Sequence, residues 1–240
     1  MVSPAIVFQG VDWAPTGQDA VLRGLALEVR PGEAVAVTGP LGSGKTAVLR
    51  LAAGLDHPNA GSVRVLGLDP TQPRTRRALG ARLGWVPRQG HLLSNLSLWD
   101  NLVLPLRWHR DPAQAEVEHL AQQALKRFGI RSLPPVLPAR APAAMCRLVA
   151  LARAFADEPA VVLCDEPTAE LDQGSATELW AHLARLAAEM GVALLAAAAH
   201  PPPVAGLRVV QLPARAAANT RRWSLTSATT ATYDDLPRHP

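Results

Sequence analysis

A glycine-rich segment at residues 39–46 constrains the fold of this 240-residue chain more than any other feature. The segment consists of Gly39, Pro40, Leu41, Gly42, Ser43, Gly44, Lys45 and Thr46, and it matches the pattern G-x-x-x-x-G-K-[ST]. A continuous apolar run at residues 34–38 precedes it, and a helical pattern at residues 47–53 follows it. This pattern is diagnostic only where it follows a strand and precedes a helix. We therefore expect a buried central strand, this loop and a helix in succession.

This segment, called the phosphate loop below, has the chemistry of a site for nucleotide phosphates. Its glycines let the backbone curl so that successive N–H groups point at phosphate oxygens, which also face the positive end of the following helix. Lys45 supplies a flexible point charge for the outer phosphates, and the Thr46 hydroxyl can serve as a ligand for Mg²⁺. A glycine-rich turn with an accidental Gly-Lys-Thr is the alternative, and the flanking strand and helix favour the phosphate site.

The remainder of the chain alternates short strand patterns with helical patterns. Strands are expected at residues 5–11, 25–29, 34–38, 62–66, 83–86, 160–164 and 192–199, and helices at residues 47–53, 112–128, 145–157 and 174–190. Such alternation is typical of an α/β fold with a mostly parallel sheet that is covered on both faces. Residues 132–144 are too rich in proline for a regular helix, and residues 213–240 lack an apolar period, so we expect a loosely ordered tail there.

Two acidic residues stand at the end of another buried strand pattern. The apolar run at residues 161–164 ends directly in Asp165 and Glu166. Ligands gather at the carboxyl ends of strands in open α/β sheets, so Asp165 is a candidate for the shell of Mg²⁺ and Glu166 for polarising an attacking water. Taken alone, the pair is equally compatible with ordinary acidic residues at a strand end. Its combination with the phosphate loop favours the catalytic interpretation.

With both motifs present, residues 5–212 resemble the ATP-binding-cassette (ABC) ATPases. Residues 165–172 are similar to the family's Walker B strand end, which carries the catalytic glutamate and leads into the D-loop. His200, which follows the apolar run at residues 192–199, resembles the switch histidine that contacts the γ-phosphate in this family. Trp13 is a candidate for the aromatic residue that stacks on adenine, with a core tryptophan as the alternative.

The resemblance implies a domain organisation. It predicts a P-loop NTPase core with a mostly parallel sheet, an N-terminal antiparallel β subdomain and an inserted α-helical subdomain at about residues 89–157. The ABC ATPase domain would then span residues 1–212 and the tail residues 213–240. The cofactors that it implies are ATP and Mg²⁺.

The sequence departs from the family in the loop that normally supplies a glutamine beside the metal. Alignment of residues 84–93 with the family's Q-loop places Arg88 at the glutamine position, and Gln89 could serve only if the loop slipped by one residue. A guanidinium cannot accept a hydrogen bond from metal-bound water and repels Mg²⁺, so this replacement alters the chemistry.

The family's signature Leu-Ser-Gly-Gly is also replaced, by the run Ala141, Pro142, Ala143, Ala144 and Met145. In the family this segment clamps the γ-phosphate of the partner subunit's ATP with a serine hydroxyl and glycine amides. The chain therefore retains its own half of an ATP site and lacks the half that it would lend to its partner. In a homodimer both composite sites would be impaired, whereas in a heterodimer with an intact signature one could still turn over.

Residues 96–107 follow the Q-loop and would line the groove for the coupling helix of a membrane subunit, with helical core as the alternative. The sequence of this segment resembles that of ATPases of the Mla type, which move phospholipids between the membranes of diderm bacteria. Lipoprotein-release ATPases are nearly as similar. The resemblance thus implies an ABC transporter ATPase whose hydrolysis is weak when the chain is alone. It also implies a dimer of cassettes, homo- or heterodimeric, that docks to a polytopic permease at the cytoplasmic face of the cell membrane. A pseudo-ATPase that acts as a regulatory or structural subunit is the alternative. A soluble ABC protein of DNA repair or translation is disfavoured because the chain has neither a long coiled-coil insertion nor a second cassette.

Composition excludes several other classes of protein. The net charge is only +4, and the basic residues are scattered apart from small clusters at residues 74–77 and 221–222, so no nucleic-acid partner is expected. The longest apolar run, residues 192–199, is far shorter than the roughly 18 to 20 residues that span a bilayer. The first ten residues lack Lys and Arg, so we expect no leader. Cys146 and Cys164 fit a reducing compartment, with Cys164 as a small buried residue.

Overall fold

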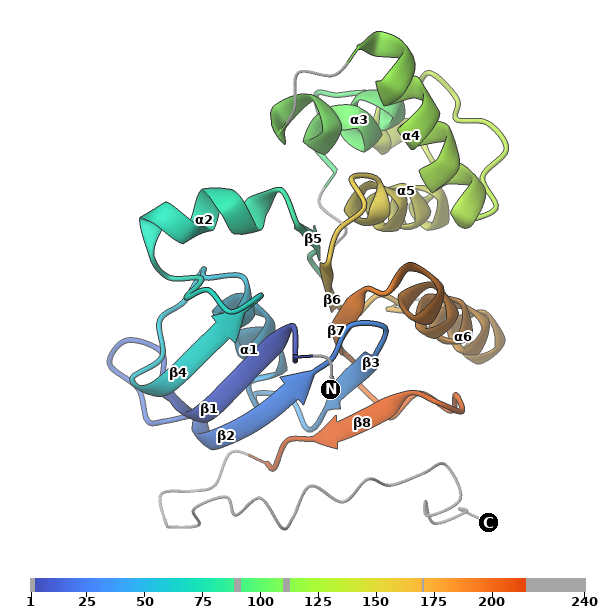
Figure 1. The fold of residues 1–240 in the computed structure, drawn as a ribbon. Helices are drawn as coiled ribbons and strands as arrows, with labels where there is room; N and C mark the ends of the chain where they lie inside the picture. Colours follow the sequence, from blue (N-terminus) through green and yellow to red (C-terminus); the bar gives the residue numbers. More distant parts are fainter. Residues whose placement is uncertain (1–2, 89–91, 110–112, 170, 215–240) are drawn as a thin grey trace, which may run out of the picture.

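Two sheets and the helices packed around them make up the fold in the computed structural model (Figure 1). The structure describes residues 3–88, 92–109, 113–169 and 171–214. The five-stranded sheet has the order β5-β6-β7-β3-β8, and every neighbouring pair in it is parallel. Its strands are β5 (Leu83–Val86), β6 (Val161–Asp165), β7 (Ala193–Ala197), β3 (Ala34–Thr38) and β8 (Arg208–Gln211). The expected α/β class with a mostly parallel sheet is therefore confirmed.

A second sheet has three antiparallel strands in the order β2-β1-β4. These strands are β1 (Ile6–Trp13), β2 (Leu22–Val29) and β4 (Ala60–Val65). The antiparallel β unit that the resemblance implied is thus present, with β4 contributed from beyond the first helix. The strand expected at residues 62–66 ends one residue earlier, because Leu66 adopts a left-handed backbone conformation with φ of 51°.

The central strands are buried along their whole length, and their alternating side chains divide the core into two clusters. Every residue of β3, β6 and β7 is buried. Ala36, Cys164 and Ala196 face the cluster formed with α5 (Ala143–Phe155) and α6 (Gln173–Met190). The intervening residues face a cluster formed by α1 (Lys45–Ala52) and the antiparallel sheet. The sheet is covered on both faces as expected, but on the second face a sheet shares this role with a single helix.

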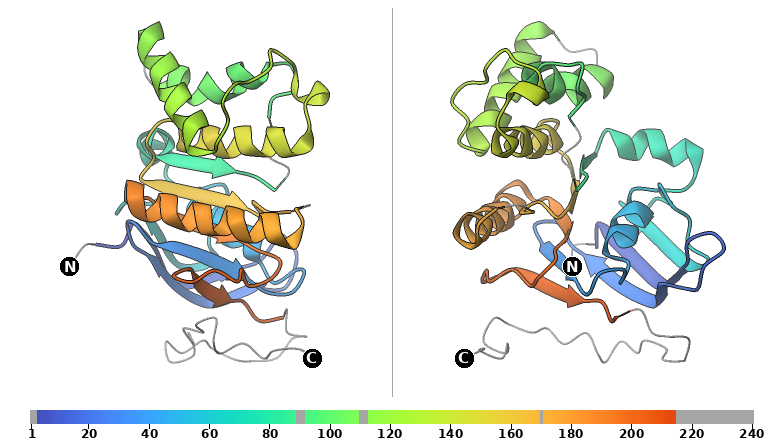
Figure 2. Two further views of the ribbon diagram at one scale, coloured as in Figure 1. Left: turned by 90° about the vertical axis from the view of Figure 1, so that its right-hand side faces the viewer. Right: turned by 180° about the vertical axis from the view of Figure 1, so that it is seen from behind.

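Three helices gather at one end of the molecule, above the edge of the parallel sheet that carries β5 (Figures 1 and 2). These are α3 (Leu98–His109), α4 (Gln114–Arg127) and α5. The apolar residues of α4 recur at helical spacing and are buried, namely Val117, Ala121, Ala124 and Leu125. The helices predicted at residues 112–128 and 145–157 are confirmed within two residues at each end that the structure describes.

Several elements, among them α2 (Pro73–Gly80) and β8, were not predicted from the sequence. Helix α2 contains three arginines and buries only Leu79, so it has no apolar period to reveal it. Strand β8 is a short edge strand whose residues are at best half-buried. The arginine cluster at residues 74–77 is exposed as expected, although Arg76 also donates a hydrogen bond from Nη2 to Gly54 O at 3.0 Å.

Three further expectations concern the ends and the cysteines. Residues 215–240, which include most of the predicted tail and the Arg221 and Arg222 pair, lie outside the described residues, as does Gln89. No helix in the described ranges is long and apolar enough to cross a membrane. Both cysteines are free, and Cys164 is fully buried, which raises the pKa of its thiol.

Candidate functional site

The candidate residues lie at one edge of the parallel sheet because of the strand order. Strands β6, β7 and β3 are parallel neighbours, so their carboxyl ends meet at the same edge. The phosphate loop follows β3, Asp165 ends β6, and His200 lies three residues beyond the end of β7. Segments far apart in the sequence are thereby brought to the place where open α/β sheets bind their ligands.

The glycines of the phosphate loop are required by backbone conformation and by close packing. Gly39, Gly42 and Gly44 have φ values of 147°, 79° and 96°, which side chains rarely allow. A Cβ atom at Gly39 would lie 2.7 Å from Leu212 O, and one at Gly44 would lie 2.7 Å from Leu22 Cδ2. A Cβ at Gly42 would meet nothing within 4 Å. The loop is therefore packed tightly against the protein on one side and open on the other.

The open side of the loop presents groups that suit an anion. Helix α1 begins at Lys45, and neither a side-chain cap nor an acidic residue occupies its first turn. Lys45 Nζ donates to Gly39 O at 2.7 Å and to Pro40 O at 3.1 Å, which holds its ammonium across the loop. The Ser43 hydroxyl is buried without a hydrogen-bond partner among the described residues. The amides of the helix start and a cation together fit the oxygens of a phosphate chain, whereas the Ser43 hydroxyl lies inside the loop beside Gly39.

Thr46 and Asp165 connect the phosphate loop to β6. Thr46 Oγ1 donates to Asp165 Oδ2 at 2.9 Å, and Asp165 is only 5% exposed. Burial raises the pKa of the Asp165 carboxyl, and Glu166 raises it further, while the Thr46 hydrogen bond, Arg88 and Lys45 lower it. A hydroxyl and a carboxylate in contact are the hard oxygen ligands that Mg²⁺ prefers.

The raised pKa of Asp165 predicts that its charge lowers stability in the absence of a ligand. Since the native pKa exceeds that of the unfolded chain, the native state binds more protons between these two values, and ionised Asp165 destabilises the fold above them. Asp165→Asn keeps an acceptor for Thr46 without the charge. We expect a melting temperature higher by about 2–4 °C near neutral pH and no difference in acid.

Asp172→Asn is the matched control for this thermal unfolding experiment. Hydrogen bonds from the Ser175 side chain and amide lower the pKa of Asp172, which caps α6, so its charge favours the native state. The same substitution there should not raise the melting temperature. A lower melting temperature for Asp165→Asn near neutral pH would contradict the assignment of a desolvated carboxylate.

Glu166 is held by three contacts. Its backbone is left-handed with φ of 50°, unusual for a residue with a side chain, and its N–H donates to Ala197 O at 3.0 Å. Arg147 Nη1 donates to Glu166 O at 3.4 Å and to Pro167 O at 3.2 Å. The side chain is 14% exposed, and its Oε2 lies 3.1 Å from Arg88 Nη2. The candidate catalytic carboxylate is thus paired with the residue at the glutamine position of the family's Q-loop.

Among the residues that the structure describes, two other predicted site residues are not part of this network of hydrogen bonds and ion pairs. His200 is exposed, and Trp13 is half-buried against the core at the end of β1. Within the described residues, no hydrogen bond joins either side chain to Lys45, Thr46 or Asp165. Arg147, in contrast, was not identified from the sequence, because only the folded chain brings it to the backbone of Glu166.

The run that replaces the family signature stands at the start of α5. The helix begins at Ala143, and Pro142 is its N-cap, with no side-chain hydrogen bond to the first turn. Pro142, Ala143 and Ala144 are exposed. Proline has neither an N–H nor a hydroxyl, so this helix start carries fewer donors than Ser-Gly-Gly would. Residues 141–145, which sequence analysis aligned with the family signature, thus lie at the start of a helix as expected.

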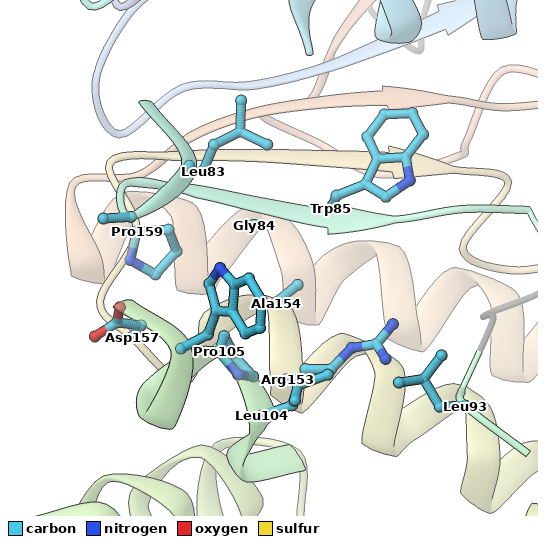
Figure 3. Close-up of a pocket in the computed structure, with 13 residues that line it drawn as sticks. Leu83, Gly84, Trp85, Leu93, Leu104, Pro105, Arg153, Ala154, Asp157 and Pro159 are labelled. Atoms are coloured by element: carbon cyan, nitrogen blue, oxygen red, sulfur yellow. The ribbon is translucent and has the colours of Figure 1, made fainter. Parts of the chain in front are cut away.

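An apolar cavity of about 440 Å³ lies where β5 and α2 meet the helices α3 and α5 (Figure 3). Its lining includes Leu83, Trp85, Leu104, Pro105, Trp108 and Arg153. Its floor is closely packed, since a Cβ at Gly84 would lie 2.1 Å from Ala154 O. Burial lowers the pKa of the Arg153 guanidinium.

Residues 96–107 lie partly in the core and partly at this cavity. Leu98, Leu102 and Leu106 are fully buried core residues of α3. Leu104 and Pro105 line the cavity, and Trp108 in the next turn is 79% exposed. Buried Asn101 connects the preceding loop to α3, donating from Nδ2 to the carbonyl oxygens of Leu93, Leu96 and Ser97.

Comparison with known proteins agrees with this geometry. Residues 22–169 match the family model described as "ABC transporter". The chain is 36% identical over 179 residues to lipoprotein-releasing system ATP-binding protein LolD 1 of Rhodopirellula baltica, covering 73% of this chain and 78% of that protein. It is 33% identical over 197 residues to methionine import ATP-binding protein MetN of Chlamydia pneumoniae, covering 80% of this chain and 58% of that protein.

A solved structure supports the same assignment over the whole domain. The ATP-binding cassette MJ0796, in a dimeric post-hydrolysis state with ADP and Pi, superposes with a TM-score of 0.75 at 25% identity. The match covers 86% of this chain and 94% of that cassette. With the phosphate loop, the strand order and Asp165 in their places, the chain belongs to the ATP-binding cassettes of the ABC transporter family of ATPases.

Proposed function

We propose that this chain is the ATP-binding subunit of an ABC transporter and that ATP binds at the phosphate loop. The observation that carries this proposal is the hydrogen bond from Thr46 Oγ1 to Asp165 Oδ2 at 2.9 Å. It joins the phosphate loop after β3 to a buried carboxylate at the end of β6, from which β7 separates β3 in the sheet, and a glycine-rich turn of purely structural origin would not require this bond. The two oxygens are suited to Mg²⁺, and bound Mg²⁺ would neutralise charge on the outer phosphates.

Each predicted site residue receives a role in this proposal. Lys45 binds the outer phosphates, Glu166 orients the attacking water, and His200 contacts the γ-phosphate from the end of β7. Trp13 stacks on adenine from the end of β1. The remaining residues of the phosphate loop bind phosphate through backbone amides, except Pro40, which has no N–H.

The cavity between β5 and α3 is the proposed docking site for a membrane permease. It is apolar, concave and bordered by the exposed indole of Trp108, features that suit a short amphipathic helix. Several relatives are ATP-binding proteins of lipoprotein-releasing systems, so the proposed cargo is a lipid or a lipid-linked molecule. Docking would place the chain at the inner face of the cell membrane.

A second candidate function is that of a catalytically impaired subunit in a heteromeric transporter. Two observations favour it, namely the ion pair of Arg88 with Glu166 and the loss of donors at residues 142–144. In a heterodimer, a partner with an intact signature would complete the site that uses Lys45 and Asp165. The ATPase rate of the chain with and without the subunits encoded beside it separates the two functions: stimulation is expected of an active subunit, and no hydrolysis from this chain's site is expected of an impaired one.

Substitution of Trp108 tests the docking site. We expect Trp108→Asp to reduce co-purification of the adjacent permease about tenfold, because a charge would have to be desolvated against an apolar helix. The substituted side chain is exposed, so the melting temperature should not change. Leu55→Asp, at an apolar residue that is 52% exposed and outside the cavity lining, is the control. Unchanged co-purification of Trp108→Asp with the permease would contradict docking at this cavity.

A further inference from the structure

Arg88 and Glu166 form an ion pair within the candidate site. The Arg88 Nη2 to Glu166 Oε2 distance is 3.1 Å. Glu166 is 14% exposed whereas Arg88 is 58% exposed, so the guanidinium enters from solvent toward a mostly buried carboxylate. Arg88 follows β5 and Glu166 follows its neighbour β6, so both stand at the ligand-binding edge of the sheet.

The charges around this pair balance without a metal ion. Arg88 and Lys45 both act on Asp165 as positive charges, and Glu166 acts on it as a negative charge, so these four side chains share one electrostatic neighbourhood. Asp165 in turn is bonded to Thr46. Two carboxylates thus face two cations from the chain itself. A divalent cation placed among them would meet the fixed positive charge of Arg88 at short range.

We propose that Arg88 takes over much of the role of the divalent cation at this site, so that the chain binds ATP with little dependence on Mg²⁺. This inference rests on the proposed binding of ATP at the phosphate loop. The guanidinium is permanently charged, and its planar donors match the oxygens of a phosphate group. When its donors turn from Glu166 to the outer phosphates, Arg88 and Lys45 together offset part of the negative charge of ATP.

Because Arg88 is largely exposed, its side chain can be replaced without loss of the fold. An ion pair with one largely exposed partner contributes little to stability, so Arg88→Gln should fold as the wild type does. Arg82→Gln removes the same charge from an exposed arginine at the opposite end of β5 and serves as the matched control. Arg88→Lys keeps the charge and removes the planar fork.

The experiment measures the Kd of the full chain for the non-hydrolysable analogue AMP-PNP by calorimetry, with excess MgCl₂ and again with excess EDTA. For the wild type and Arg82→Gln, we expect the two Kd values to agree within about threefold, since the charge of Arg88 remains in both media. For Arg88→Gln, EDTA should weaken binding by about tenfold or more, because neither the guanidinium nor the metal is then present. Arg88→Lys should lie between these two.

Two outcomes would overturn the inference, and they differ in what else they exclude. If AMP-PNP binds to the wild type with MgCl₂ but at least about tenfold more weakly with EDTA, and Arg88→Gln shows the same ratio, Arg88 does not replace the metal. ATP binding at the phosphate loop would then still stand. If no variant binds AMP-PNP in either medium, the proposed function fails together with the inference.

Discussion

Lys45→Ala is expected to weaken ATP binding about 100-fold or more, because charge-assisted hydrogen bonds of Lys45 to the outer phosphates are lost. The substitution also removes the contacts of Nζ with Gly39 O and Pro40 O, which hold the ammonium across the loop. Titration calorimetry with AMP-PNP measures the change directly. The melting temperature should change little, since these contacts lie at the open side of the loop.

Lys126→Ala is the control for this experiment. Lys126 is the only other lysine in the chain and lies exposed near the end of α4. The same substitution there should leave the Kd for AMP-PNP unchanged. Binding by Lys45→Ala within about threefold of the wild type would show that the phosphate loop does not hold the outer phosphates.

Restoration of the signature is the second change with a large expected effect. The triple variant Pro142→Ser, Ala143→Gly and Ala144→Gly gives the start of α5 the hydroxyl and N–H of a serine and removes the two methyl groups beside the amides of residues 143 and 144. Donors that stabilise charge in a transition state are worth about 100-fold in rate, so hydrolysis by the chain should rise by about that factor. The rate is measured as phosphate released per chain at saturating ATP and Mg²⁺. No increase would mean that a missing clamp does not limit hydrolysis.

A gain in helix stability must be separated from this gain in rate. Serine at the position of Pro142 is also a better N-cap, which stabilises a helix by about 1 kcal/mol. Ala113→Ser makes the equivalent change at the exposed N-cap of α4, which also lacks a side-chain hydrogen bond. It should stabilise the protein without raising hydrolysis. Adding Arg88→Gln to the triple variant should raise hydrolysis further, because Glu166 is then released from its ion pair.

The sequence was most informative where local pattern and long-range structure agree. The strand at residues 34–38 was predicted with its observed bounds because its first four residues are apolar and a glycine that must turn follows it. The location of Asp165 followed from the same reasoning, since a carboxylate after a buried strand marks the ligand-binding edge.

The unpredicted features depend on contacts that no local pattern encodes. Helix α2 buries one leucine and otherwise shows arginines to solvent, so its stability comes from its neighbours rather than from amphipathic spacing. The pairing of Arg88 with Glu166 depends on β5 and β6 being neighbours, and the carbonyl contacts of Arg147 depend on where α5 packs. The sequence identified Arg88 as a departure from the family, but it did not predict the ion pair of Arg88 with Glu166.

These features together describe a cassette with a complete phosphate loop, a candidate catalytic glutamate paired with an arginine, and a helix start with few donors. We propose that ATP binding and ATP hydrolysis are separated in this chain. Turnover in a transporter would then depend on a partner cassette with an intact signature.

The most direct test measures bound ATP and released phosphate in one sample of the purified full chain with Mg²⁺. We predict one ATP bound per chain, with phosphate release no faster than that of Lys45→Ala. Phosphate release at about 1 s⁻¹ or faster by the isolated chain, a rate ordinary for enzymes, would contradict the separation of binding from hydrolysis.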